Sequence, residues 1–309
     1  MARPLRVQFQ GARYHVVNRG NYRSDVFGTV GAAQAFESVL SEGCKRYGWQ
    51  LFAHVIMRNH FHLAVETPLP NLAEGMHWLQ GTFATRFNRY RGERGHLFQG
   101  RYYAGLIEDA RALSQVVNYI HLNPVRAGIV NGSQASAFRW SSLPKFLKEQ
   151  RPEHLHANPW LEHLGFSDCS AGWTGYKGLL AELADDPSAP EMEVGKLSQG
   201  WAIGTLGWRR AIARENAQRA ISPGISSGEA SELKAAVWHA ELERALAALG
   251  KDLVQAPVET QSAKWKVQAA RRLRFVGAPC TWIASALHMG SAANVRAYLY
   301  RESCSHVTP

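Results

Sequence analysis

The 309-residue sequence has no apolar run of the roughly 18–20 residues that a membrane-spanning helix requires. Its first ten residues, MARPLRVQFQ, contain no apolar segment of the kind found in a secretory signal. The four cysteines, Cys44, Cys169, Cys280 and Cys304, form no CxxC pair, so neither a disulfide framework nor a zinc cage is indicated. These absences predict a cytoplasmic protein with free thiols and no membrane partner.

Acidic residues are missing from residues 261–301, which hold seven lysines and arginines. Residues 1–150 carry 18 basic and 9 acidic residues, whereas residues 151–260 carry 10 and 15. The formal net charge is +10. Two basic segments separated by an acidic one indicate two surfaces that face a polyanion. Ordinary solvated faces of lysine and arginine are the alternative.

Residues 1–150 alternate the signals of strands and helices. Val30 to Trp49 has apolar residues at helical spacing and breaks at Gly48, and Asn71 is placed to cap a second helix that ends at Gly92. The resulting order, β-α-β-β-α-β-α, predicts an α+β fold with a ferredoxin-like split βαβ arrangement, an antiparallel sheet and helices on one face. Strands are expected within 12–20, 50–57, 60–67 and 95–108, and helices within 30–49, 72–91 and 109–124.

The remainder of the chain is predicted to be mostly α-helical. Residues 151–260 are interpreted as a helical connector domain whose tryptophans are mostly core. Within residues 261–309, two short helices joined by the turn GSA form a pattern typical of a helix-turn-helix. This segment resembles the C-terminal DNA-binding helix-turn-helix of the bacterial chromosomal replication initiator; a generic pair of helices is the alternative. Three domains follow, 1–150, 151–260 and 261–309.

The stretch MRNHFHLAVET places His60 and His62 on the same side of a strand, about 7 Å apart by strand rise. Two imidazoles in this arrangement can converge on one divalent ion, although a histidine in a strand is more often a hydrogen-bonded core residue. Glu66 shares their parity at a greater distance, and His54 could approach from the neighbouring strand. HxH alone therefore leaves metal binding and a core role about equally open.

The segment VVNYIHLNPVRAG supplies a second set of polar groups. Tyr119 and Asn123 are four residues apart and so lie on one helix face. Pro124 disfavours a continuing helix, so we expect the helix to end or kink there. An amide oxygen at such a helix end can reach a metal, while Tyr119 presents a hydroxyl one turn earlier.

Four blocks, MRNHFHLAVET, LFQGRYYAGLIE, YIHLNPVRAGIV and FRWSS, resemble the single-tyrosine HUH transposases. They are most similar to the REP-associated tyrosine transposases, relatives of the IS200-like insertion-sequence enzymes. The resemblance covers residues 1–150. HFH corresponds to the HUH motif, histidine–hydrophobic–histidine.

The resemblance implies a role for each matched residue. His60, His62 and Asn123 would bind a divalent metal, Mg²⁺ or Mn²⁺. Tyr119 would be the nucleophile that cleaves and rejoins single-stranded or hairpin DNA through a 5′-phosphotyrosine intermediate. A tyrosine hydroxyl is a weak nucleophile at neutral pH, so a metal or basic neighbour must help to deprotonate it. Tyr102 and Tyr103 are rival nucleophiles, but no amide follows them one helical turn later.

The expected partner is single-stranded or hairpin DNA, with flanking duplex at the helix-turn-helix, and the protein is expected to be nucleoid-associated as a monomer or a homodimer. A non-catalytic DNA-binding regulator that kept the fold is the main alternative, and an RNA-binding domain of similar order is a third. The arginines assigned to DNA binding are Arg19, Arg58, Arg101, Arg126, Arg86, Arg89, Arg271, Arg272 and Arg296. Surface ion pairing is the alternative for each of them.

Overall fold

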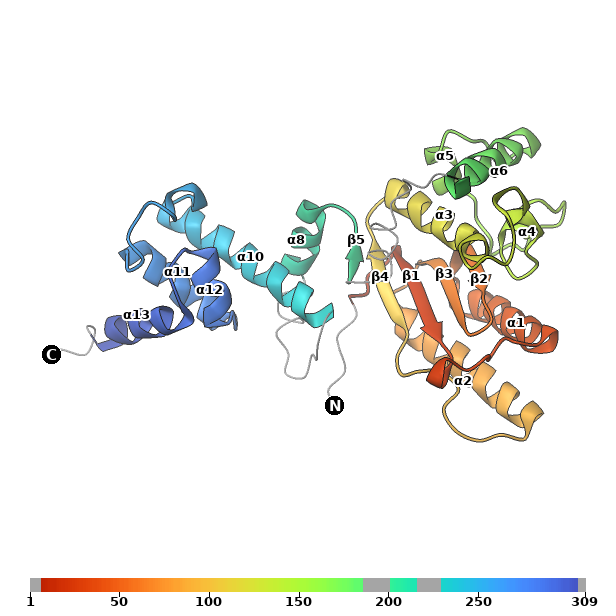
Figure 1. Ribbon diagram of the computed structural model, residues 1–309, viewed down its shortest axis with the longest axis horizontal. Coiled ribbons are helices and arrows are strands. Elements are labelled where there is room, and N and C mark those ends of the chain that lie inside the picture. The colour runs from red at the N-terminus through yellow and green to blue at the C-terminus, as the bar shows by residue number, and fades with distance from the viewer. Residues whose placement is uncertain (1–6, 186–200, 216–228, 305–309) are drawn as a thin grey trace. The chain divides into compact units, whose positions relative to one another are not determined.

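The computed structural model describes residues 7–185, 201–215 and 229–304. The chain forms two compact units, which divide between Gly204 and Thr205 (Figure 1). The domain boundaries expected near residues 150 and 260 fall inside these units. The reason in each case is a shared core, described below.

The first unit is built on a five-stranded sheet of order β2-β3-β1-β4-β5 (Figure 1). The central strand β1 (Ala12–Arg19) pairs antiparallel with β3 (His60–Thr67) and with β4 (Tyr103–Ile107). β2 (Gln50–Ile56) pairs antiparallel with β3. This order of the first four strands is that of a ferredoxin-like split βαβ sheet, so the predicted fold class is confirmed for this unit.

Helices cover both faces of the sheet. α1 (Val30–Tyr47) and α2 (Leu72–Arg91) lie on the face of Phe61, whose ring is 4.6 Å from that of Phe36 in α1. α3 (Ala110–Arg126) packs against β2 and β3 on the opposite face. The expectation that the helices share one face is correct for α1 and α2 and wrong for α3, because both faces of β3 are buried and each must be covered.

The ends of α1 and α2 follow from local side-chain chemistry. The Thr29 hydroxyl caps α1, and Gly48 ends it in the left-handed conformation with a φ of 67°. The prediction that Asn71 caps α2 with its side chain is wrong. Its amide instead accepts a hydrogen bond from the Trp49 indole and donates one to the Tyr47 carbonyl, which ties the start of α2 to the end of α1.

The structure shortens one predicted strand and adds another. β4 covers only five residues of the expected strand 95–108. β5 (Ala202–Ile203) pairs parallel with β4, inside a region expected to be helical. A strand of two residues has no periodicity that a sequence pattern could reveal.

Four helices that follow α3 in the chain lie on the side of α3 that faces away from the sheet. They are η2 (Gly132–Ala137), α4 (Leu143–Phe146), α5 (Trp160–His163) and α6 (Ser170–Asp185). His121 of α3 is fully buried, with one ring nitrogen 2.9 Å from the Tyr176 hydroxyl and the other 2.9 Å from the Ser142 hydroxyl. The boundary expected at residue 150 therefore cuts through the packing that holds α3.

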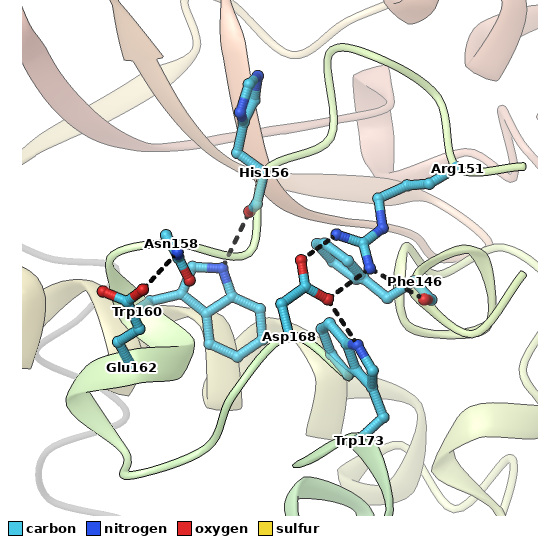
Figure 2. A network of polar contacts seen from close by, with 8 residues as sticks. All are labelled: Phe146, Arg151, His156, Asn158, Trp160, Glu162, Asp168 and Trp173. Carbon is cyan, nitrogen blue, oxygen red and sulfur yellow. Dashed lines mark hydrogen bonds and ion pairs between the residues drawn. The ribbon is translucent and has the colours of Figure 1, made fainter. Parts of the chain in front are cut away.

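Polar contacts reinforce the same region. Asp168 accepts two hydrogen bonds from the Arg151 guanidinium, at 2.6 and 2.7 Å, and one from the Trp173 indole at 2.8 Å (Figure 2). The Arg151 guanidinium also lies over the Phe146 ring, 5.0 Å from its centroid. Residues that the sequence presents as a connector are thus a tightly bonded part of the first unit.

The second unit is helical over its described residues. α8 (Leu206–Glu215), α10 (Glu229–Leu249), η3 (Leu253–Gln255), α11 (Lys264–Phe275), α12 (Cys280–Ala286) and α13 (Ala292–Cys304) follow one another. Side chains from α10 to α13, among them Leu246, Leu273, Ile283 and Val295, form one buried cluster. The boundary expected at residue 260 divides this cluster.

The helices predicted from the sequence of residues 261–301 are present as α11, α12 and α13. The DNA-binding role of this segment stays a prediction. At least two of its seven basic residues have structural contacts: the buried Lys266 ammonium donates to the carbonyls of Ala256 and Glu259, and the Arg274 guanidinium donates to the Ala278 carbonyl at 2.7 Å. In the part of the chain that the structure describes, no helix combines the length and apolar character needed to cross a membrane.

Candidate active site

The HFH segment begins β3, and its register with β1 determines its neighbours. His60 pairs with Arg19, and His62 pairs with Val17. Directly paired residues project from the same face of a sheet, so these four side chains share the face that α3 covers. The two imidazole rings lie edge to face with their centroids 5.1 Å apart.

Tyr119 reaches the histidine pair from α3. The Asp109 carboxylate accepts a hydrogen bond from the first turn of this helix and so defines where it begins. The Tyr119 ring lies 5.4 Å from the His62 ring, centroid to centroid, and the Asn123 side chain hydrogen-bonds His60. The histidine pair His60 and His62 and the pair Tyr119 and Asn123 are almost sixty residues apart in sequence, yet they are adjacent in the fold.

The helix was expected to end or kink at Pro124, and α3 does not end there. The helix continues to Arg126, and the Asn123 carbonyl still accepts a hydrogen bond from the Ala127 amide at 3.0 Å. Gly128 then closes the turn with a φ of 67°. A proline in the last turn removes a single hydrogen bond, which the rest of a well-packed helix tolerates.

His15 is a member of the site that sequence reasoning missed. It lies on β1, is fully buried, and places its Nε2 atom 3.0 Å from Nδ1 of His62. The two rings stack with their centroids 5.3 Å apart, and the Tyr119 ring lies 5.8 Å from His15. The alternation of side chains along ARYHVVNRG shows which residues share a face with His15. Only the pairing of β1 with β3 brings His15 to His62.

Burial keeps the two HFH histidines neutral. It lowers the pKa of His62 well below its usual value, and the neighbouring His15 and His60 rings lower it further. Burial also lowers the pKa of His60; its hydrogen bond with Asn123 opposes this effect, and the charge of Arg19 adds to it. Neutral imidazoles offer the lone pairs that a metal ion needs.

A cavity of about 690 Å³ opens beside the histidines. Arg19, Arg23 and Arg101 line it together with His60, and no aspartate or glutamate is among its lining residues. Arg19 and Arg101 were expected to bind DNA, whereas Arg23 was not singled out. A basic cavity lined by His60 and His62, with no acidic side chain in its lining, is suited to an anionic substrate.

The other predicted DNA-binding arginines are not among the residues that line this cavity. Arg126 places its guanidinium over the Tyr119 ring, 5.1 Å from the centroid. Arg58 pairs with Asp25 at 2.6 Å, and Arg86 makes two hydrogen bonds with Glu42. The remaining four, all exposed, are Arg89 on α2 and Arg271, Arg272 and Arg296 in the second unit.

The alternative candidates for metal ligand and nucleophile that the sequence suggested occupy different places in the fold. His54 pairs with Leu63 and so faces α1, where its Nε2 atom lies 3.2 Å from the Glu37 carboxylate. The Glu66 carboxylate accepts a hydrogen bond from Arg13 at 2.8 Å. Tyr102 is buried, whereas Tyr103 lines the cavity. The suggestion that His54 reaches the HFH pair is therefore wrong.

The donors present fit a divalent ion bound in part by the protein. Among the described residues, no group of three or more histidine, cysteine or acidic side chains could hold a metal. His60 and His62 supply two imidazole nitrogens, and the Asn123 amide, which contacts His60, supplies an oxygen. Such a set leaves coordination positions for substrate oxygens or water, as Mg²⁺ and Mn²⁺ sites commonly do.

Comparison with known proteins finds similar sequences over this part of the chain. The family model described as "Transposase IS200 like" matches residues 8–123. A curated protein from Haemophilus influenzae (strain ATCC 51907 / DSM 11121 / KW20 / Rd), described as "Putative REP-associated tyrosine transposase", is 28% identical over 142 residues, which cover 42% of this chain and 80% of the relative.

A solved structure of a REP-associated tyrosine transposase bound to a REP hairpin matches 56% of this chain and 97% of its own, with 20% identity and a TM-score of 0.41. The family match spans β1 to the end of the Tyr119–Asn123 segment. The resemblance drawn from the motifs is therefore confirmed over residues 8–123, and the matched proteins are transposases.

Proposed function

From the match of residues 8–123 to the IS200-like transposase family, we propose that this protein is a metal-dependent DNA strand transferase. It cleaves and rejoins single-stranded or hairpin DNA of the REP type through a 5′-phosphotyrosine intermediate. The observation that carries the proposal is the 5.4 Å approach of the Tyr119 ring to His62. A tyrosine nucleophile beside a neutral imidazole that itself lines a basic cavity suits phosphoryl transfer to tyrosine.

Each residue has a defined part in the reaction. The Tyr119 oxygen attacks phosphorus and forms a P–O bond while the bond from phosphorus to the 3′ oxygen breaks. The phenolic proton leaves to a base, and the departing 3′ oxygen takes up a proton, which yields a 5′-phosphotyrosine and a free 3′-OH. Attack by a 3′-OH on this ester reverses the step and rejoins a strand.

His60, His62 and Asn123 would hold the divalent ion, Mg²⁺ or Mn²⁺. When bound, it supplies Lewis-acid stabilisation of the charge that develops on the scissile phosphate. Arg19 and Arg101 bind phosphates of the strand in the cavity. Arg126, whose guanidinium lies over the Tyr119 ring, helps to hold the orientation of that ring.

The second unit contributes a second DNA contact in this proposal. The exposed arginines Arg271, Arg272 and Arg296 stand on α11 and α13, in a segment free of acidic residues from 261 to 301. Duplex DNA flanking the cleaved hairpin is the partner that a helix-turn-helix would bind. A DNA substrate also implies a cytoplasmic, nucleoid-associated location.

The test is formation of a covalent protein–DNA adduct. Purified protein, Mn²⁺ or Mg²⁺ and a labelled hairpin oligonucleotide should give a species that survives denaturing electrophoresis. Tyr119→Phe should abolish it, whereas Tyr102→Phe, which removes a rival hydroxyl, should retain it. An adduct formed equally by Tyr119→Phe would refute the assignment. Normal DNA binding without an adduct in either metal would favour the non-catalytic regulator instead.

A further inference from the structure

A short loop, Gly20 to Ser24, is fastened beside His60. The Gly20 amide donates to the Asn59 carbonyl at 2.7 Å, and the Asn21 amide donates to the Leu97 carbonyl at 2.9 Å. The Asn59 side chain also donates to the carbonyl of Arg23 at 3.3 Å. Because Asn59 directly precedes His60, these bonds give the loop a defined position at the cavity.

The backbone of this loop is unusual at two successive residues. Within η1 (Asn21–Arg23), Tyr22 has a φ of 52° and Arg23 a φ of 59°. The left-handed region is unfavourable for a bulky side chain, and glycine, asparagine or aspartate are the residues that tolerate it best. Strain of this kind persists where the surrounding structure imposes it, and it is concentrated at ligand sites.

The Tyr22 side chain gains nothing from burial in return. The residue is 92% exposed, although a tyrosine ring normally covers part of its surface against apolar neighbours. An aromatic ring held in solvent by a strained, fastened loop is an unfavourable feature of the free protein. We expect contacts with a bound partner to offset the cost of this strained backbone and exposed ring.

The charge next to Tyr22 indicates what the complex contains. Arg23 adjoins Tyr22 in sequence and lines the cavity together with Arg19 and Arg101, and acidic side chains are missing from that lining. Alternating aromatic and basic groups along a groove are the arrangement by which proteins hold single strands, with bases stacked on rings and phosphates on arginines.

We propose that Tyr22 is a base-stacking residue for the single-stranded DNA that enters the cavity beside His60. One base stacks on the Tyr22 ring while Arg19, Arg23 and Arg101 bind the adjoining phosphates. This inference rests on the proposed function, because it takes single-stranded DNA as the substrate, and it names the side chain that holds the strand outside the reacting atoms.

Binding in EDTA separates this role from catalysis. A single-stranded oligonucleotide containing 2-aminopurine reports stacking through quenching of its fluorescence, and anisotropy gives the Kd. Tyr22→Asn should raise the Kd about tenfold, which corresponds to ~1.4 kcal/mol, and should reduce the quenching. Tyr22→Phe keeps a flat ring and should preserve both signals.

Two controls test whether weaker binding has another cause, either unfolding of the variant or the loss of any exposed apolar side chain. Tyr22→Asn should have an unchanged or higher Tm, since asparagine tolerates a positive φ, so weaker binding would not reflect unfolding. Leu69→Asn removes another exposed apolar side chain, 60% exposed and in a loop, and should leave the Kd within about twofold of wild type.

The inference is overturned if Tyr22→Asn binds DNA with the wild-type Kd and quenching. A fall from dimer to monomer in light scattering, with DNA binding unchanged, would also overturn it and would identify a contact between copies of the chain. The covalent adduct at Tyr119 in Mn²⁺ remains a separate readout. An intact adduct with unchanged binding by Tyr22→Asn rejects the stacking role and leaves the proposed function standing.

Discussion

Nε2 of His15 lies 3.0 Å from Nδ1 of His62, and the two buried rings are stacked on each other. A hydrogen bond at Nδ1 leaves Nε2 of His62 as the nitrogen that can bind a metal. Histidine ligands generally donate their second N–H to an acceptor, which orients the ring. If His62 binds a metal through Nε2, its Nδ1–H donates to Nε2 of His15, and His15 then carries its own proton on Nδ1.

Removing this acceptor should weaken metal binding. His15→Phe leaves the Nδ1–H of His62 without a partner, and we expect the affinity for Mn²⁺ to fall about 10- to 100-fold. His15→Gln, whose amide oxygen can accept the same bond, should lose less. Mn²⁺ titration followed by electron paramagnetic resonance measures this. His121→Gln, at another buried histidine, is the control, and equal affinity in His15→Phe would contradict the role.

Two glycines of α2 should respond to alanine in opposite directions. A Cβ on Gly75 would overlap the Trp49 indole, whereas a Cβ on Gly81 meets nothing within 4 Å. Gly75→Ala should therefore destabilise the protein by about 1–3 kcal/mol through overpacking. Gly81→Ala should stabilise it by about 0.5–1 kcal/mol through helix propensity. Chemical denaturation of both variants measures the difference, and a stabilising Gly75→Ala would show that Trp49 can move.

Buried His121 should make the fold sensitive to acid. Burial, and then the charge of His54, lowers the pKa of His121 to about 3. The folded state then binds fewer protons than the unfolded chain below pH 6.5, so stability is lost as the pH falls from 6.5 towards 3. His121→Gln keeps hydrogen-bonding groups without titrating. Its free energy of unfolding should fall less steeply with decreasing pH than that of the wild type. The two slopes should differ by up to about 1.4 kcal/mol per pH unit.

Denaturation at several pH values between 7 and 4 tests this dependence. Other buried histidines contribute to the acid sensitivity in both proteins, so the comparison is between slopes. Parallel slopes for wild type and His121→Gln would show that His121 takes up protons equally in the folded and unfolded states, contrary to its lowered pKa in the fold.

The first unit should need the residues beyond Gln150. A chain that ends there loses Trp160 and Tyr176, which are fully buried near His121 of α3. Each such side chain contributes on the order of 2 kcal/mol through burial. We expect a chain ending at Gly204 to unfold cooperatively and one ending at Gln150 to lose that transition. Circular dichroism during heating distinguishes them, and equal transitions would restore the boundary at residue 150.

Local patterns were sufficient for the order of elements in residues 1–150. The alternation of HFHLAVET placed His60 and His62 on one face, and the i,i+4 spacing placed Tyr119 with Asn123. Local patterns failed where a side chain had a distant partner. Asn71 looked like a helix cap, yet its amide binds Trp49 and Tyr47, because a partner in the fold competes with the local one.

Sequence alone determined the strand and helix that carry the candidate site residues, since periodicity is a local property of the chain. Tertiary structure decided which groups meet. The register of β1 against β3 brings His15 to His62, and the packing of α3 over that face brings Tyr119 to both. Register and packing depend on contacts between segments far apart in sequence, so one-residue slips that no local pattern reveals would have turned His15 away from the site.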